Sequence, residues 1–160
     1  MGADIIPIDQ VRSRQLAVQE KQQYVTMRLG GQLFGLPVLS VQDVLKEQHI
    51  TPIPLAASEI AGALNLRGRI VTVVDMRRRL GIDTTGAQKK AMQVVVEHGG
   101  DLYSLLVDEV GDVMLLSRSD YESNPSNLSP QWLRVARGVF RLEGEIMVLL
   151  DVDSVLSIGA

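Results

Sequence analysis

The feature that most constrains the fold of this 160-residue chain is an internal repeat. Residues 28–44, RLGGQLFGLPVLSVQDV, align without a gap with residues 97–113, EHGGDLYSLLVDEVGDV, at an offset of 69. Residues 62–80, GALNLRGRIVTVVDMRRRL, align with residues 138–156, GVFRLEGEIMVLLDVDSVL, at an offset of 76. Because apolar and turn positions recur in the same order, we expect the two halves to fold alike. The longer loop of the second half is expected around YESNPSNLSPQW.

Short apolar runs separated by glycine turns make up both halves. Two β-rich runs flank Gly30 and Gly31, and two more flank Gly68. Glycine supplies the positive φ that a tight hairpin turn requires. Several short strands with regularly spaced turns and few helical stretches favour small β-barrels or a β-sandwich. Since about 70 residues provide little core on their own, we expect two like barrels packed together, with a seam that offers a partner a groove.

The chain is expected to consist of a flexible N-terminal tail, residues 1–22, and a single domain, residues 23–158. Within the domain, the repeat predicts one subdomain over residues 23–88 and a second over residues 89–158. No apolar run approaches the roughly 18 residues that span a bilayer, and the N-terminus does not resemble a secretory signal. We therefore expect a cytoplasmic protein without direct membrane insertion. The absence of cysteine excludes disulfides and thiolate metal sites.

Three consecutive arginines, Arg77 to Arg79, raise the question of nucleic-acid binding. The net charge of −3 and an aromatic content of 4% argue against it, because such proteins present basic patches and stacking side chains. The equivalent stretch of the second half, DVDSV, is acidic. A solvated charged segment, or a rim for an acidic protein patch, is the favoured interpretation.

An enzymatic function would need an acid–base pair, a nucleophile or a metal cluster. Asp75 and Asp151 are equivalent in the repeat and could form a catalytic pair, but each follows an apolar strand and precedes a short run that ends in leucine. That position suits a helix or turn cap better than catalysis. His49 and His98 are isolated from each other in the sequence. A small barrel enzyme or ligand-binding module that uses Asp75 and Asp151 remains the alternative hypothesis.

Arg67 departs from the repeat. It lies beside Gly68 at a predicted hairpin turn, whereas the second half has Glu143 at the same position. A residue that the shared fold does not require is a candidate for function, although a lone surface arginine often has none. Its planar, fork-shaped donor suits a bidentate contact with Asp43 or with a partner.

The stretch NLRGRIVTVVDMRRRLG, preceded by SEIAGAL, resembles the signature of the CheW family of bacterial chemotaxis coupling proteins. The resemblance extends to VTMRLGGQLFGLPVLSVQDV, VDEVGDV and GVFRLEGEIMVLLDVDSVL, and spans about residues 23–157. It implies an all-β fold of two pseudo-symmetric, five-stranded SH3-like barrels with short helices. It also implies a noncatalytic adaptor without cofactors that links chemoreceptor tips to the histidine kinase CheA.

The same resemblance assigns partners and surfaces. It implies binding to the regulatory domain of a CheA-type kinase and to the cytoplasmic hairpin tips of methyl-accepting chemoreceptors. The chain would be a monomer in solution and a component of larger arrays, with no nucleic-acid partner. Matched position by position, the expected receptor-binding residues are Val38, Leu39, Asp43, Arg67, Met92 and Val110, and the expected kinase-binding residues are Val41 and Gly62.

Overall fold

The computed structural model describes residues 21–46, 48–83, 91–125 and 127–158. The expected N-terminal tail lies outside this part of the chain, except for Lys21 and Gln22, which begin the first strand. No helix within the described ranges is long and apolar enough to cross a membrane. In chain order the elements are β1 (Lys21–Leu29), β2 (Gln32–Pro37), η1 (Val38–Ser40), β3 (Val41–Leu45), β4 (Ile60–Leu66), β5 (Arg69–Asp75), α2 (Met76–Arg79), β6 (Met92–His98), β7 (Asp101–Val107), β8 (Glu109–Ser117), η2 (Arg118–Asp120), β9 (Tyr121–Glu122), α3 (Pro130–Leu133), β10 (Ala136–Leu142), β11 (Glu145–Leu150) and α4 (Val152–Leu156).

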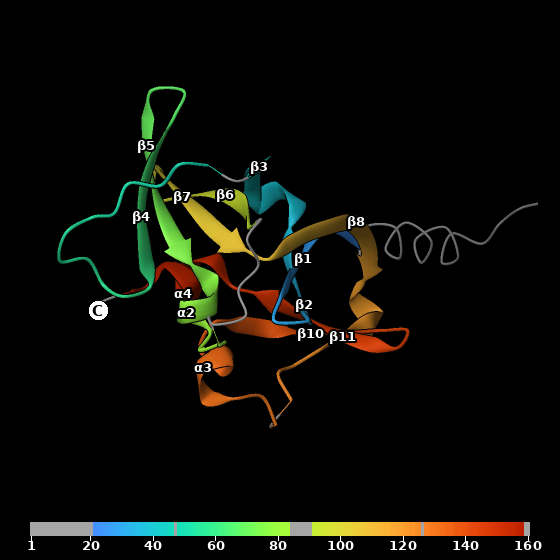
Figure 1. Ribbon diagram of the computed structural model, residues 1–160. Coiled ribbons are helices and arrows are strands. Elements are labelled where there is room, and N and C mark those ends of the chain that lie inside the picture. Colours follow the sequence, from blue (N-terminus) through green and yellow to red (C-terminus); the bar gives the residue numbers. More distant parts are fainter. Residues whose placement is uncertain (1–20, 47, 84–90, 126, 159–160) are drawn as a thin grey trace, which may run out of the picture.

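The strands form two curved sheets that face each other (Figure 1). One sheet has six strands in the order β8-β1-β2-β11-β10-β9, and the other has five in the order β3-β6-β7-β5-β4. Neighbours are antiparallel, except that β11 runs parallel to β2 and β5 runs parallel to β7. The predicted all-β fold of two packed subdomains with short helices is confirmed. The short strand β9 adds a sixth strand to one of the two sheets.

The sequence repeat is also a repeat of strand pairing. Val148 pairs with Phe34 in the parallel pair of one sheet, and their repeat equivalents, Thr72 and Tyr103, pair in the other. The register shift between β1 and β8 recurs between β6 and β3, and that between β10 and β11 recurs between β4 and β5. Two like folding units therefore share one pseudo-symmetric arrangement, as the repeat predicts.

Each sheet contains strands from both halves of the sequence. The six-stranded sheet takes β1 and β2 from the first half, and the five-stranded sheet takes β6 and β7 from the second. The repeat predicts a boundary between residues 88 and 89. The two sheets do not divide the chain at this point, because the first hairpin of each half belongs to the sheet that contains the remaining strands of the other half. This boundary lies among residues 84–90, outside the described residues.

The predicted glycine turns are confirmed. Gly30 and Gly31 have φ values of 58° and 85° between the paired strands β1 and β2, and Gly99 and Gly100 repeat this geometry with 61° and 85°. Positive φ at both central residues is the requirement of the tight hairpin turn that matches strand twist. These turns are short enough to fix the register of each hairpin locally.

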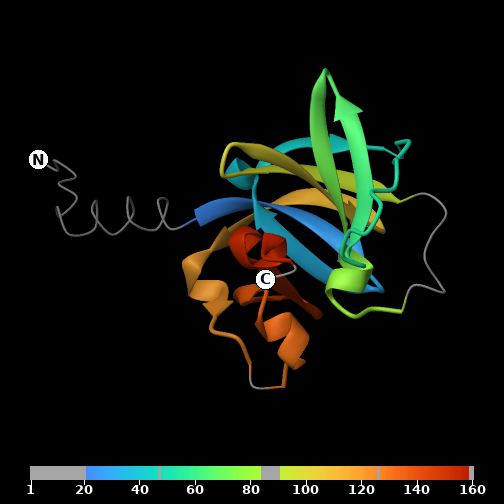
Figure 2. The same cartoon turned by 90° about the vertical axis from the view of Figure 1, so that its left-hand side faces the viewer.

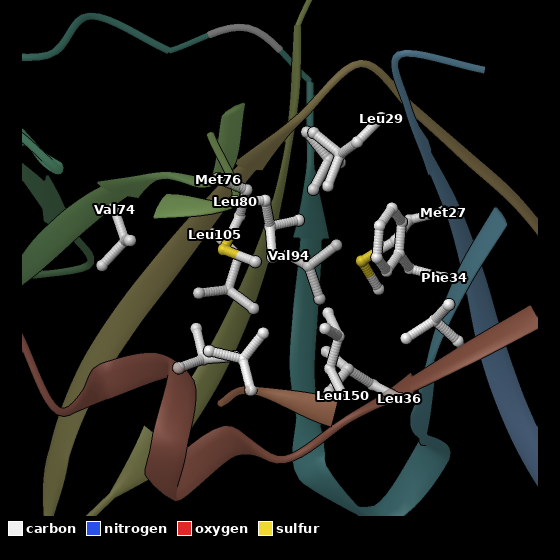
Figure 3. Packing of buried hydrophobic residues seen from close by; sticks show 14 of the residues in the cluster. Met27, Leu29, Phe34, Leu36, Val74, Met76, Leu80, Val94, Leu105 and Leu150 are labelled. Atoms are coloured by element: carbon white, nitrogen blue, oxygen red, sulfur yellow. The ribbon is translucent and has the colours of Figure 1, made fainter. Parts of the chain in front are cut away.

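Alternating side chains give each sheet two apolar faces. The largest cluster lies between the sheets and includes Met27 and Phe34 of the first half together with Val94, Leu105 and Leu150 of the second (Figure 3). A second cluster lies within the curve of the six-stranded sheet, and a third within that of the five-stranded sheet. The shared cluster makes the two subdomains depend on each other for burial of their apolar surface.

Candidate partner-binding surface

Arg67 and Asp43 form an ion pair at the tip of the β4–β5 hairpin. Figures 1 and 2 show that this hairpin projects beyond the rest of its sheet. Arg67 occupies the first central position of the turn with φ 52°, and Gly68 follows with φ 85°. The Arg67 guanidinium lies 3.2 Å from an Asp43 carboxylate oxygen on β3. Since β3 and β4 are opposite edges of the five-stranded sheet, this contact shows that the sheet curls into a barrel.

The ion pair is too exposed to be a major source of stability. The Arg67 side chain is 80% exposed and the Asp43 side chain 31%, and exposed pairs contribute little to folding. Asp43 is held in place, because its second carboxylate oxygen accepts a hydrogen bond from the Val44 amide at 2.9 Å. The repeat equivalents are the two acids Asp112 and Glu143, which have like charge. The pair therefore distinguishes one barrel tip from the other.

The expected apolar positions lie in two different settings. Val38 and Leu39 form the short helix η1, where Leu39 is 96% exposed. They line a shallow hollow together with Leu115 of β8, a residue that the sequence analysis did not single out. Met92 and Val110 are half-buried and pack against the cluster between the sheets. Val38 and Leu39 are therefore brought together at one hollow, whose lining residues do not include Met92 and Val110.

The two expected kinase-binding positions are not equally accessible. Val41 begins β3 and is half-buried against the central cluster, as is its repeat equivalent Val110 of the expected receptor set. Gly62 is buried at the register shift between β4 and β5, with φ 152°. A Cβ at this position would lie 2.3 Å from the Thr51 carbonyl oxygen. A substitution at Gly62 would therefore act by displacing the segment around Thr51.

The aspartates of the alternative hypothesis are bound to their own neighbours. Asp75 is the N-cap of α2, and its side chain accepts hydrogen bonds from the Arg77 and Arg78 amides. Asp151 occupies the equivalent position before α4, where it accepts a hydrogen bond from the Ser154 hydroxyl at 2.7 Å and pairs with Arg137 at 3.4 Å. The described residues contain no group of three His, Cys, Asp or Glu that could hold a metal ion. The predicted capping role is therefore confirmed for the Asp75 side chain, whereas the Asp151 side chain accepts no hydrogen bond from a backbone amide of α4.

Two of the three consecutive arginines bind other parts of the same chain. The expectation of a solvated segment or a rim for a partner is therefore wrong for Arg77 and Arg79. Arg77 reaches Asp108 through two hydrogen bonds of 2.7 and 2.6 Å, and the two side chains are only 12% and 11% exposed. Arg79 donates to the Val155 and Ser154 carbonyls at 2.9 Å. Only Arg78 is exposed. The linear sequence could not reveal these contacts, because the acceptors lie far along the chain.

Asp108 receives hydrogen bonds from two parts of the first half. Besides Arg77, the Gly30 amide of the β1–β2 turn donates to the carboxylate at 2.9 Å. Burial by itself would raise the pKa of the Asp108 carboxyl, but the hydrogen bonds from Arg77 and Gly30 and the arginine charge outweigh it and lower the pKa. This Arg77–Asp108 clamp therefore fixes α2 and the β1–β2 turn to the corner between β7 and β8.

Comparison with known proteins gives a consistent family match. The family model described as "CheW-like domain" matches residues 23–159. The chain is 30% identical over 134 residues to the chemotaxis protein CheW of Rhizobium meliloti, which covers 84% of this chain and 86% of that protein. It is also 34% identical over 114 residues to the protein PilI of Pseudomonas aeruginosa, with coverage of 66% and 64%.

A solved structure shows the same fold. The crystal structure of the scaffolding protein TtCheW from Thermoanaerobacter tengcongensis aligns with a TM-score of 0.79 and 26% sequence identity. The alignment covers 86% of this chain and 94% of that one. The similarity thus extends over nearly the whole described fold, including both barrels.

Proposed function

The chain belongs to the CheW family and is a noncatalytic chemotaxis scaffold, and from that premise we propose that it couples chemoreceptors to a CheA-type histidine kinase. The partners would be the cytoplasmic hairpin tips of methyl-accepting receptors and the regulatory domain of the kinase. The protein would act in the cytoplasm and reach the membrane only through the receptors. In solution it would be a monomer that joins larger arrays with its partners.

The observation that carries the receptor assignment is the exposed Arg67–Asp43 pair. It lies on the projecting β4–β5 hairpin, whereas the exposed Leu39 and the half-buried Val38 provide apolar contacts on η1. Helical partners typically dock apolar side chains into a groove and orient through charges at its rim. The Arg67–Asp43 pair contributes little to the stability of the fold, and this supports a role in contact with a partner.

Coupling requires two binding surfaces that both act on the equilibrium between the active and inactive states of the kinase. The kinase surface is proposed around Val41 and the segment that Gly62 supports, and the receptor surface around Val38, Leu39, Met92, Val110 and the ion pair. The rigid core between the sheets would transmit the position of one partner to the other. A scaffold changes kinase activity only if its contacts differ in strength between the active and inactive kinase states.

Replacement of Arg67 by alanine tests the receptor assignment. The Arg67→Ala variant is expected to bind a receptor hairpin fragment at least about tenfold more weakly, which corresponds to one desolvated charged contact. Its binding to the kinase regulatory domain and its thermal midpoint should stay close to those of the wild type. Calorimetric titration with each fragment and a thermal melt measure these quantities.

A matched control exists on the other barrel. Arg141 of β10 forms an exposed ion pair with Glu122 at 2.8 Å, so Arg141→Ala removes a comparable pair from a different surface. Receptor binding should be unaffected by this change. Equal losses in the two variants, or a large drop in the melting temperature of Arg67→Ala, would show that Arg67 has no specific role in receptor contact.

A further inference from the structure

A cavity of about 480 Å³ adjoins the apolar cluster inside the six-stranded sheet. Its floor is formed by Tyr24, Phe140 and Leu149, each of which is at most 6% exposed. The chain has only six aromatic residues, and three of them, Tyr24, Tyr121 and Phe140, line this cavity. Sites for small molecules have volumes of this order and are lined by aromatic side chains with a few polar groups.

The three rings are held in place around Phe140. Its ring centroid lies 5.0 Å from that of Tyr24 and 5.5 Å from that of Tyr121, in tilted and edge-to-face arrangements. The Tyr121 hydroxyl donates to the Arg137 carbonyl at 2.7 Å. Gly138 leaves space for the Tyr121 ring, since a Cβ there would lie 2.5 Å from it. The wall of the cavity is therefore an ordered set of aromatic rings.

The five-stranded barrel has different side chains at the equivalent place. Ile50 lies against Gly62 there, as Tyr121 lies against Gly138, and Ile50 packs against the apolar cluster of that barrel. The repeat equivalents of Tyr24, Phe140 and Arg137 are Gln93, Leu64 and Ala61. The shared fold therefore requires neither the rings nor the guanidinium of this cavity, which makes them candidates for a function of their own.

The charged groups of the cavity are two guanidiniums. Arg118 of η2 and Arg137 of β10 line it, and no carboxylate of the described residues does. Arg137 also pairs with Asp151 at 3.4 Å, whereas the Arg118 side chain forms no ion pair or hydrogen bond within the described part of the chain. In a chain of net charge −3, a cavity that is positive throughout indicates an anionic guest.

The Tyr24 hydroxyl adds a neutral donor at the floor. Burial raises the pKa of Tyr24, and the charges of Arg118 and Arg137 offset this only in part, so the phenol stays protonated. The hydroxyl donates to the Gln22 side-chain oxygen at 3.2 Å, which is long for such a bond. A carboxylate in the cavity would be a stronger acceptor, because charge-assisted hydrogen bonds are shorter and stronger.

We propose that this cavity binds a small aromatic carboxylate. The ring of this ligand would pack against Tyr24, Tyr121 and Phe140. Its carboxylate would accept hydrogen bonds from the Arg118 and Arg137 guanidiniums, whose planar donors match a carboxylate. None of the residues proposed above for receptor or kinase binding lines the cavity, so this inference does not rest on the coupling function.

The test is an NMR titration of the labelled full chain with three probes. Phenylacetate has both a ring and a carboxylate, phenylacetamide is its neutral isostere, and acetate lacks the ring. Phenylacetate is expected to cause saturable shifts at Tyr24, Arg118 and Tyr121, with a Kd of about a millimolar, as for so small a ligand. Phenylacetamide and acetate should each bind at least about tenfold more weakly.

Substitutions in the cavity identify the contacts. Arg118→Gln is expected to weaken phenylacetate binding about threefold, as for a partly exposed charged contact. Tyr121→Ile, which imports the side chain found in the other barrel, should weaken it to a similar extent. Arg134→Gln removes an exposed guanidinium outside the cavity and should leave binding unchanged.

The absence of saturable shifts with phenylacetate would overturn the proposal. Equal affinity for acetate would show that the rings play no part, and equal affinity for phenylacetamide would show that the guanidiniums play none. Either result contradicts a site for aromatic carboxylates, as does an Arg118→Gln variant that binds phenylacetate as tightly as the wild type.

Discussion

The two barrels share their strand registers but fill their interiors differently. The six-stranded sheet encloses Tyr24, Phe140 and Met147, whereas the five-stranded sheet has Gln93, Leu64 and Val71 at the equivalent positions. Within a barrel, a small residue at one position makes room for a large residue at another. Gly35 leaves space for the large Met147, since a Cβ there would lie 2.6 Å from the Met147 sulfur. Its equivalent, Ser104, faces a barrel with the smaller Val71.

This difference shows that the repeat preserves the pairing of the strands, not the individual side chains inside each barrel. Cores accept changes of residue when volume is conserved, and they resist changes that are not compensated. The smaller barrel also contains a buried polar pair, in which the Ser104 hydroxyl donates to the Gln93 side-chain oxygen at 2.6 Å. Gln93 and Ser104 are both fully buried. The two interiors therefore differ in polarity as well as in size.

The largest effect is expected from loss of the Arg77–Asp108 clamp, which only one half possesses. Arg77→Ala should lower the free energy of unfolding by about 2–4 kcal/mol, because it leaves a mostly buried carboxylate without its cation. The equivalent substitution in the other half, Asp153→Ala, should change stability very little. Urea denaturation of both variants measures the difference, and similar losses at the two positions would contradict the asymmetry of the two ends.

The next effect concerns the barrel that contains Gly35. Gly35→Ser imports the equivalent residue of the other barrel and should destabilise by about 1–3 kcal/mol through overpacking against Met147. Adding Met147→Val, which imports the second equivalent residue, should recover part of this loss. A double-mutant cycle of unfolding free energies measures the coupling between the sites. Strict additivity would mean that the two positions do not compensate each other.

A smaller effect is expected from the polar pair of the other barrel. Ser104→Ala should cost about 1–2 kcal/mol, because the buried Gln93 side chain loses the hydrogen bond that satisfies its oxygen. Gln93→Met in the same chain should restore most of the stability, since both polar partners are then absent. Chemical denaturation of the single and double variants tests this. A double variant less stable than Ser104→Ala would show that the Gln93 side-chain amide has another role.

The smallest expected effect is on the way the free energy of unfolding depends on pH in the acid range. The pKa of Asp108 is lowered in the folded state, so its contribution is complete above the unfolded value of about 3.9 and is lost as the pH falls through the folded value. Stability of the wild type should therefore fall more steeply below about pH 5 than stability of Asp108→Asn. Parallel pH profiles for wild type and Asp108→Asn would contradict a lowered pKa at this carboxyl.

The sequence predicted those features that depend on local chemistry. Gly30 and Gly31 were recognisable as a hairpin turn because positive φ is a local requirement, and Asp75 was recognisable as a cap for the same reason. Arg67 was identified because it departs from the repeat, and the structure places it in contact with Asp43. These inferences need only neighbouring residues or a second copy for comparison.

Features that depend on distant contacts were missed. The repeat does not reveal which hairpin joins which sheet, because that choice depends on the parallel pairing of β2 with β11 and of β5 with β7. Burial of Arg77 depends on Asp108, 31 positions away, so composition alone suggested a solvated residue. Leu115 was overlooked because alternation along a strand does not tell which face lacks a cover.

The central claim is that one copy of this chain holds a receptor tip and a kinase regulatory domain at the same time. Sedimentation velocity of the three purified components tests it directly. The account predicts a ternary complex that forms with wild-type protein and with Arg141→Ala, and that loses only the receptor fragment with Arg67→Ala. Mutually exclusive binding of the two partners, or binding of neither at tens of micromolar, would contradict it.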